Sequence, residues 1–135
     1  EMEKRNIHLQ QKYAEIEEKE VRYEEIHCDD AEYLIVAFGS CARIAQKAME
    51  EARAEGIKVG LLRPITLWPF PSKAIAERSR QVKGILTVEL NAGQMVEDVR
   101  LAVECKVPVE YFGRLGGIVP DPDEVVTALK EKIIK

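Results

Sequence analysis

The chain has 135 residues, of which 46% are hydrophobic and 33% are charged, and these values suit one compact domain. The 20 basic and 24 acidic residues are interspersed and give a net charge of −4, which argues against a nucleic-acid-binding face. The longest apolar run, Leu34 to Phe38, is far shorter than the ~20 residues of a membrane span. No secretory signal is visible, so we expect a cytoplasmic protein without a membrane or nucleic-acid partner.

The cysteines exclude two further classes of protein. Cys28, Cys41 and Cys105 are odd in number and widely spaced, so we expect neither a disulfide framework nor a cysteine-ligated iron–sulfur cluster within this chain. No Cys/His spacing typical of a metal site occurs either.

The first 28 residues differ from the rest of the chain. They are highly charged, contain no glycine or proline, and are rich in helix formers. Leu9, Tyr13 and Ile16 fall on one helical face, but this stripe is too sparse for a strong coiled coil. We therefore predict a helical connecting segment at 1–28, and a homodimer of the fragment remains an open alternative. Because the chain opens on Glu1 and not on Met, we expect it to be part of a longer protein.

Residues 29–135 alternate between short apolar runs and segments with helical spacing. Strands are expected at 33–38, 57–62, 84–90 and 108–112. Helices are expected at 41–54, 72–80, 94–105 and 122–134, the last with Asp121 as its N-cap. This order predicts an α/β fold, a three-layer α/β/α sandwich, and strands that are apolar throughout predict a mainly parallel sheet.

The loops that follow parallel strands lie at one edge of the sheet, where ligands bind in open α/β folds. The residues expected there are Ser40 and Cys41, 63–70, 91–94 and 113–117. The turn Gly39-Ser40-Cys41-Ala42 has neither the dinucleotide-binding glycine pattern nor a Walker-type Gly-Lys-Ser/Thr, so tight packing explains it best.

Cys41 lies near the expected start of a helix, where the helix dipole would lower a thiol pKa. A nucleophilic cysteine also needs a base, and the only two histidines, His8 and His27, lie in the leading segment. A structural thiol is therefore favoured over a catalytic one, and we assign no catalytic residue in this chain.

The sequence RPITLWPFP at 63–71, here called the proline loop, is the most unusual local feature. Its three prolines exclude a helix and an interior strand. A stiff loop that presents Leu67, Trp68 and Phe70 favours an interface, and the alternative is that Trp68 folds back over the core.

Several polar side chains share the same expected edge. Together with the aromatic side chains of the proline loop they form the set of candidate interface or anion-contact residues: Arg63, Thr66, Trp68, Phe70, Asn91, Gln94 and Arg114. An alternative function follows from this set, namely a stand-alone module that binds a small anion near Ser40, Asn91 and Arg114.

Four stretches resemble one known family, in order and with the expected spacing. They are GSCARIA at 39–45, VGLLRPITLWPFP at 59–71, VELNAGQMVEDVRLAV at 88–103 and YFGRLGGIVPDPDEV at 111–125. They are similar to the C-terminal domain of the alpha subunit of 2-oxoacid:ferredoxin oxidoreductases of the 2-oxoglutarate, 2-oxoisovalerate and pyruvate types. The resemblance covers about residues 29 to 135.

This resemblance implies a fold like the transketolase C-terminal domain, with five mostly parallel strands, one of them an antiparallel edge strand. It also implies a parent complex in which thiamine diphosphate and iron–sulfur clusters convert a 2-oxoacid and CoA to an acyl-CoA and reduce ferredoxin. The implied partners are the remaining alpha-subunit domains, the thiamine-diphosphate-binding beta subunit and, through the complex, ferredoxin. Since this chain lacks the GDG…N signature and cluster cysteines, we expect no cofactor in this chain and no activity from it alone.

Overall fold

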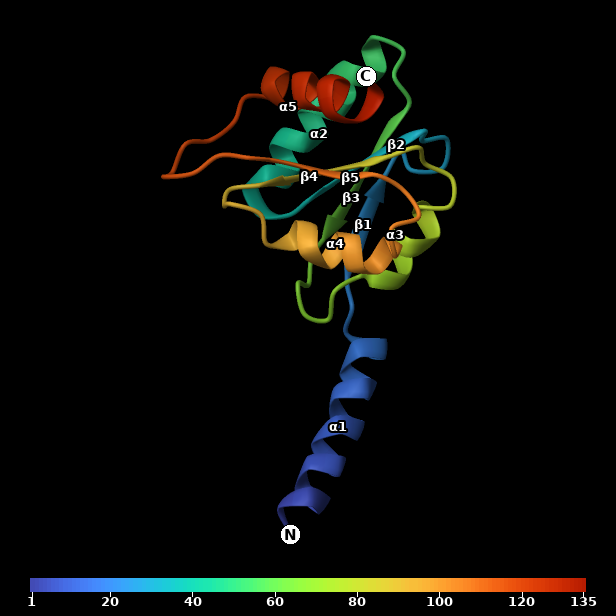
Figure 1. The fold of residues 1–135 in the computed structure, drawn as a ribbon, viewed down its shortest axis with the longest axis vertical. Helices are drawn as coiled ribbons and strands as arrows, with labels where there is room; N and C mark the ends of the chain where they lie inside the picture. Colours follow the sequence, from blue (N-terminus) through green and yellow to red (C-terminus); the bar gives the residue numbers. More distant parts are fainter.

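The computed structural model describes residues 1–135 and contains one five-stranded sheet (Figure 1). The strands are β1 (Tyr23–Ile26), β2 (Tyr33–Ala37), β3 (Val59–Pro64), β4 (Ile85–Glu89) and β5 (Val109–Gly113). Their order in the sheet is β1-β3-β2-β4-β5, and all neighbours are parallel except β1, which runs antiparallel to β3. The predicted α/β sandwich with a mostly parallel five-stranded sheet is confirmed.

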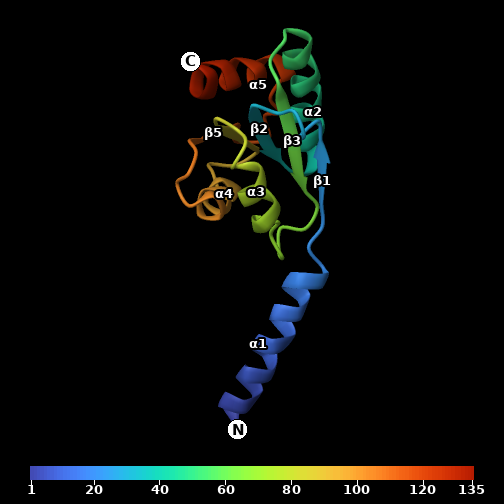
Figure 2. The ribbon, with the colours of Figure 1, turned by 90° about the vertical axis from the view of Figure 1, so that its right-hand side faces the viewer.

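Helices cover both faces of the sheet (Figure 2). One face carries α2 (Gly39–Ala54) and α5 (Pro122–Leu129), which continues as a π-helical turn over Lys130–Ile134, and the other face carries α3 (Ser72–Arg78) and α4 (Met95–Val103). As predicted, Asp121 begins α5, where its side chain and that of Glu124 form a reciprocal capping box.

The central strand β2 explains why the chain contains a continuous apolar run. Leu34 and Val36 belong to the core under α3 and α4, whereas Ile35 and Ala37 belong to the core under α2 and α5. Because successive side chains point to opposite faces of a strand, a strand covered on both faces has to be apolar at every position.

Residues 23–26 differ from the helical prediction for 1–28. The helix α1 spans Met2–Lys19, and β1 follows it as the antiparallel edge strand that was expected from the family but not located in the sequence. The strand is stabilised from outside its own sequence: Arg63 donates to Glu24 at 3.2 Å, and Arg78 donates to Glu25 at 2.6 Å.

Strand β3, which was predicted to end at residue 62, ends two residues later. Arg63 and Pro64, which were expected in an irregular loop, complete β3 by pairing with Glu24 and Tyr23 of β1. The pairing of β2 with β3 stops at Leu62 of β3, so only β1 pairs with the last two residues of β3. Pro64 lies beyond the last pair with β2, so its missing N–H breaks no hydrogen bond between those two strands.

The helix α1 projects away from the α/β domain in both views (Figures 1 and 2) and buries none of its residues. The ring of Tyr13 in this helix packs edge to face on the ring of Trp68, with the ring centroids 5.9 Å apart. No helix of the chain combines the length and the apolar character needed to cross a bilayer.

Candidate functional site

The carboxyl ends of β2, β3, β4 and β5 meet at one edge of the sheet, and large apolar side chains are exposed on the loops that follow three of these strands. Seven of the twelve exposed large apolar residues lie there: Ile65, Leu67, Trp68, Leu90, Leu115, Ile118 and Val119. We call this set the edge surface. Its residues form separate groups after β3, β4 and β5, and exposed large apolar side chains at one edge of a sheet are a feature of interaction surfaces.

The proline loop is held by two hydrogen bonds of Thr66, one with the segment before β1 and one within the loop. The Thr66 hydroxyl accepts from the backbone N–H of Arg22 at 2.9 Å and donates to the carbonyl of Pro69 at 2.7 Å. Pro69 is buried and follows a cis peptide bond after Trp68. The Trp68 side chain is 57% exposed, so the alternative in which it folds over the core is wrong. The Thr66 hydroxyl therefore stabilises the conformation of the proline loop.

A groove of about 730 Å³ separates the proline loop and the start of α3 from the C-terminal half of α1. Its apolar lining includes Trp68, Phe70 and Pro71, and the opposite wall on α1 carries Glu17 and Glu18. Two of the candidate residues, Trp68 and Phe70, line this groove.

Glu89 is the residue that organises the loop between β4 and α4, and the sequence interpretation missed it. It is fully buried at the end of β4. Its carboxylate accepts from the backbone N–H groups of Met95 at 2.7 Å and Val96 at 3.1 Å, and from that of Gln94 at 3.2 Å. A carboxylate placed at these free N–H groups stabilises the positive end of the helix.

Asn91 and Tyr111 complete this network. Asn91 donates its amide to Glu89 at 3.2 Å and accepts from the Gly93 N–H at 2.8 Å, which closes a tight turn in which Gly93 has φ of +99°. The Tyr111 hydroxyl donates to the Asn91 carbonyl. Burial, and then the nearby Glu89 carboxylate, raise the pKa of Tyr111. The Asn91 side chain therefore shapes the loop and caps no helix directly.

The seven candidate residues fall into two groups and do not form one pocket. Arg63, Thr66, Trp68 and Phe70 lie at the end of β3, whereas Asn91, Gln94 and Arg114 follow β4 and β5. Three strand intervals separate β3 from β5, which corresponds to about 14 Å.

Both arginines of the candidate set have carboxylate partners within the chain. Arg63 pairs with Glu24 at 3.2 Å, and Arg114 pairs with Glu124 of α5. An anion at either arginine would compete with a carboxylate that is already in place, so the geometry favours a protein-contact surface over an anion site.

The cysteines do not fit an iron–sulfur cluster. Cys28 and Cys41 are buried in separate hydrophobic cores, and Cys105 is exposed after α4. No three His, Cys, Asp or Glu side chains gather as a metal site. Burial raises the pKa of Cys41, and the Glu89 carboxylate raises it further, so the lowering expected from the helix dipole is wrong at this position.

The three thiols are expected to differ sharply in reactivity. Burial raises the pKa of Cys28 to about 11, and because the thiolate is the nucleophile, Cys28 and Cys41 should resist iodoacetamide at pH 8 in the folded protein. Cys105 should be alkylated readily. Mass spectrometry of native and denatured samples measures this, and alkylation of Cys41 at the rate of Cys105 would contradict it and revive Cys41 as a reactive group.

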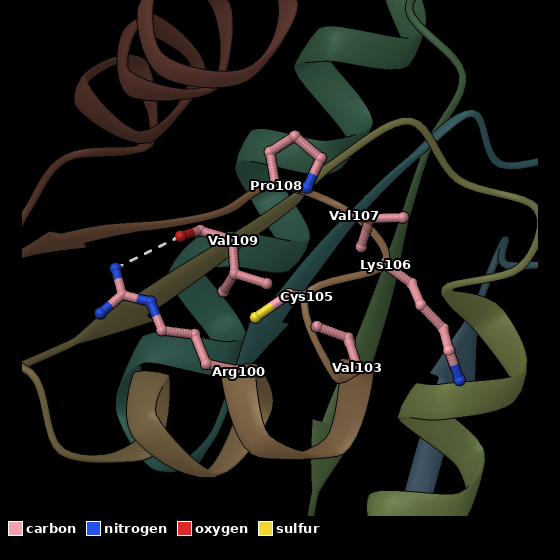
Figure 3. Close-up of a pocket in the computed structure, with 7 residues that line it drawn as sticks. All are labelled: Arg100, Val103, Cys105, Lys106, Val107, Pro108 and Val109. Atoms are coloured by element: carbon pink, nitrogen blue, oxygen red, sulfur yellow. Dashed lines mark hydrogen bonds between the residues drawn. The ribbon is translucent and has the colours of Figure 1, made fainter.

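A second hollow, of about 390 Å³, lies at the opposite edge of the sheet, between the end of α4 and the start of β5 (Figure 3). Arg100 lies at one side of it and donates to the carbonyl of Val109 at 3.3 Å, while Cys105 lies among the apolar side chains. None of the candidate residues lines it, so this hollow is separate from the edge surface.

Comparison with known proteins identifies the family of this chain. Residues 31–125 match the family described as pyruvate:ferredoxin oxidoreductase core domain II, and the chain belongs to this family. The chain is 50% identical over 131 residues to the ketoisovalerate oxidoreductase subunit VorB of Methanothermobacter thermautotrophicus, an alignment that covers 97% of the chain and 37% of that relative.

Two solved structures support the same fold. A 2-oxoglutarate:ferredoxin oxidoreductase from Magnetococcus marinus, solved with 2-oxoglutarate, coenzyme A and succinyl-CoA bound, superimposes with a TM-score of 0.72 and 28% identity over 82% of this chain and 19% of that one. A split-gene transketolase superimposes with a TM-score of 0.71 and 22% identity over 82% of this chain and 40% of that one. The fold is therefore transketolase C-terminal-like, and the chain spans little more than a third of the VorB relative.

Proposed function

We propose that this chain is a non-catalytic domain of the alpha subunit of a 2-oxoacid:ferredoxin oxidoreductase. In this role it supports assembly of a complex that uses thiamine diphosphate and iron–sulfur clusters to convert a 2-oxoacid and CoA to an acyl-CoA, with reduction of ferredoxin. The edge surface carries the proposal, because a sheet edge with seven exposed large apolar side chains is suited to protein contact. The three free cysteines are consistent with a reducing compartment, so we propose the cytoplasm.

We propose that this domain contributes contacts and that other parts of the complex contribute the chemistry. The state of its side chains supports this assignment. Three groups near the edge that could have had a chemical role have a structural one: Glu89 accepts from the N–H groups at the start of α4, Arg114 pairs with Glu124, and Cys41 is buried. The remaining edge residues are suited to contact with the other alpha-subunit domains and with the subunit that binds thiamine diphosphate.

Two finer assignments belong to the same proposal. We propose a branched-chain 2-oxoacid as substrate, since the relative with 50% identity is a ketoisovalerate oxidoreductase subunit. We also propose that α1, within the segment predicted at 1–28, connects the α/β domain to a preceding domain, which is consistent with a helix that buries no residue of its own. The domain predicted at 29–135 then also includes β1, which is part of its sheet.

Capture of the tagged subunit from cells that express it with its neighbouring subunits tests the function. The captured material is expected to contain thiamine diphosphate and iron and to reduce a dye in the presence of CoA and 2-oxoisovalerate. A matched preparation without CoA controls for other oxidases. Capture of the subunit alone, without cofactors or activity, would show that the likeness extends to the fold only.

A further inference from the structure

The residues that line the groove between α1 and the proline loop indicate which kind of chemical group would bind there. One side offers aromatic surface from Tyr23 and Trp68, which are 43% and 57% exposed. Phe70, half-buried, adds to this side. Such rings attract a cation, and a planar guanidinium stacks on them best.

The wall formed by α1 carries unpaired negative charge. Glu15 and Glu20 have partners in Lys19 at 3.6 Å and Arg22 at 3.8 Å. Glu17 and Glu18, the two carboxylates that line the groove, form no ion pair in the chain. The facing side contributes one basic residue, Lys73, so the charged lining of the groove is net negative.

The position of these carboxylates on the helix is itself unfavourable. Glu17 and Glu18 lie in the last turn of α1, which ends at Lys19, and negative side chains oppose the negative end of a helix dipole. A cation bound beside them would relieve this repulsion as well as pairing with the carboxylates. The aromatic side and the acidic wall thus favour the same group.

We propose that this groove binds a segment of a partner subunit that inserts an arginine side chain next to an apolar residue. The guanidinium lies between the aromatic side and Glu17 and Glu18, and the apolar residue packs on Phe70 and Pro71. The volume of about 730 Å³ exceeds what one side chain fills and suits a short segment. This inference rests on the proposed function, because the segment is assigned to another subunit of the same complex.

Charge reversal in the assembled complex tests the inference. The double variant Glu17→Lys with Glu18→Lys should raise the dissociation constant between the subunits at least about tenfold. The matched control, Glu50→Lys with Glu131→Lys, makes the same change in net charge on exposed residues of α2 and of the π-helical turn after α5 and should stay within twofold. Lysine favours a helix as well as glutamate does and suits its C-terminal turn, so loss of α1 would not explain the effect.

A photo-reactive amino acid at Phe70 then identifies the occupant. Cross-linking to a partner-subunit segment that contains arginine supports the inference, and mutation of that arginine to glutamate should restore assembly of the charge-reversed variant. Cross-linking to a second copy, or to another part of the same subunit, overturns it. Normal assembly of the charge-reversed variant overturns the inference and leaves the proposed function standing, whereas a wild-type subunit that assembles with no partner overturns both.

Discussion

Replacing Glu89 with alanine is expected to cost more than about 3 kcal/mol of the free energy of unfolding. The carboxylate is fully buried and accepts from three backbone N–H groups at the start of α4 and from the Asn91 amide. Each buried donor left without a partner costs about 1–3 kcal/mol, and the lost side chain also leaves a cavity. Urea denaturation of wild type and variant measures the difference.

Glu97→Ala is the matched control for this prediction. Glu97 belongs to the first turn of the same helix, but it is exposed and its ion pair with Arg100 has a long distance of 3.8 Å, so it should change stability by less than about 1 kcal/mol. Glu89→Gln should fall between the two, because an amide keeps one acceptor oxygen. A loss below 1 kcal/mol in Glu89→Ala would mean that water reaches and satisfies the exposed N–H groups.

The sheet was largely predictable because its main strands carry their own signal. The run from Leu34 to Phe38 is apolar at every position, and burial on both faces requires that pattern. The strand β1 carries no such signal: it contains Glu24 and Glu25 and follows a helix without a break in composition. Its partners, Arg63 and Arg78, lie 39 and 53 residues further along the chain than Glu24 and Glu25, so only the folded chain reveals it.

The exposure of Trp68 could be predicted because a stiff loop presents it. The role of Glu89 could not be predicted, because it depends on packing between distant segments of the chain. The three prolines of the proline loop predict that Trp68 is presented to the outside, and its exposure is confirmed, while its part in an interface stays a prediction. The role of Glu89 depends on where α4 begins and on Tyr111, which approaches from β5. The only signal in the sequence is one carboxylate at the end of an apolar strand, directly before a turn.

The edge surface also explains why one domain can contribute to an enzyme without reacting itself. The two arginines beside this surface, Arg63 and Arg114, are paired within the chain with Glu24 and Glu124. The seven exposed side chains of the edge surface are apolar and lie on the loops after β3, β4 and β5. Little conformational entropy is lost when such a surface is covered, which favours assembly over turnover as its task.

Trp68→Ala is expected to weaken association with the partner subunits by at least about thirtyfold, or ~2 kcal/mol. The same change should lower the stability of the folded chain by less than about 1 kcal/mol, because the side chain is 57% exposed and loses chiefly its edge-to-face contact with Tyr13. Leu101→Ala is the matched control: Leu101 is 79% exposed near the end of α4, away from the edge surface. Sedimentation velocity over a concentration series measures association, and denaturation measures stability. If Trp68→Ala and Leu101→Ala assemble equally well, the edge surface does not bind its partner through Trp68, since aromatic anchors at the centre of an interface carry most of its binding energy.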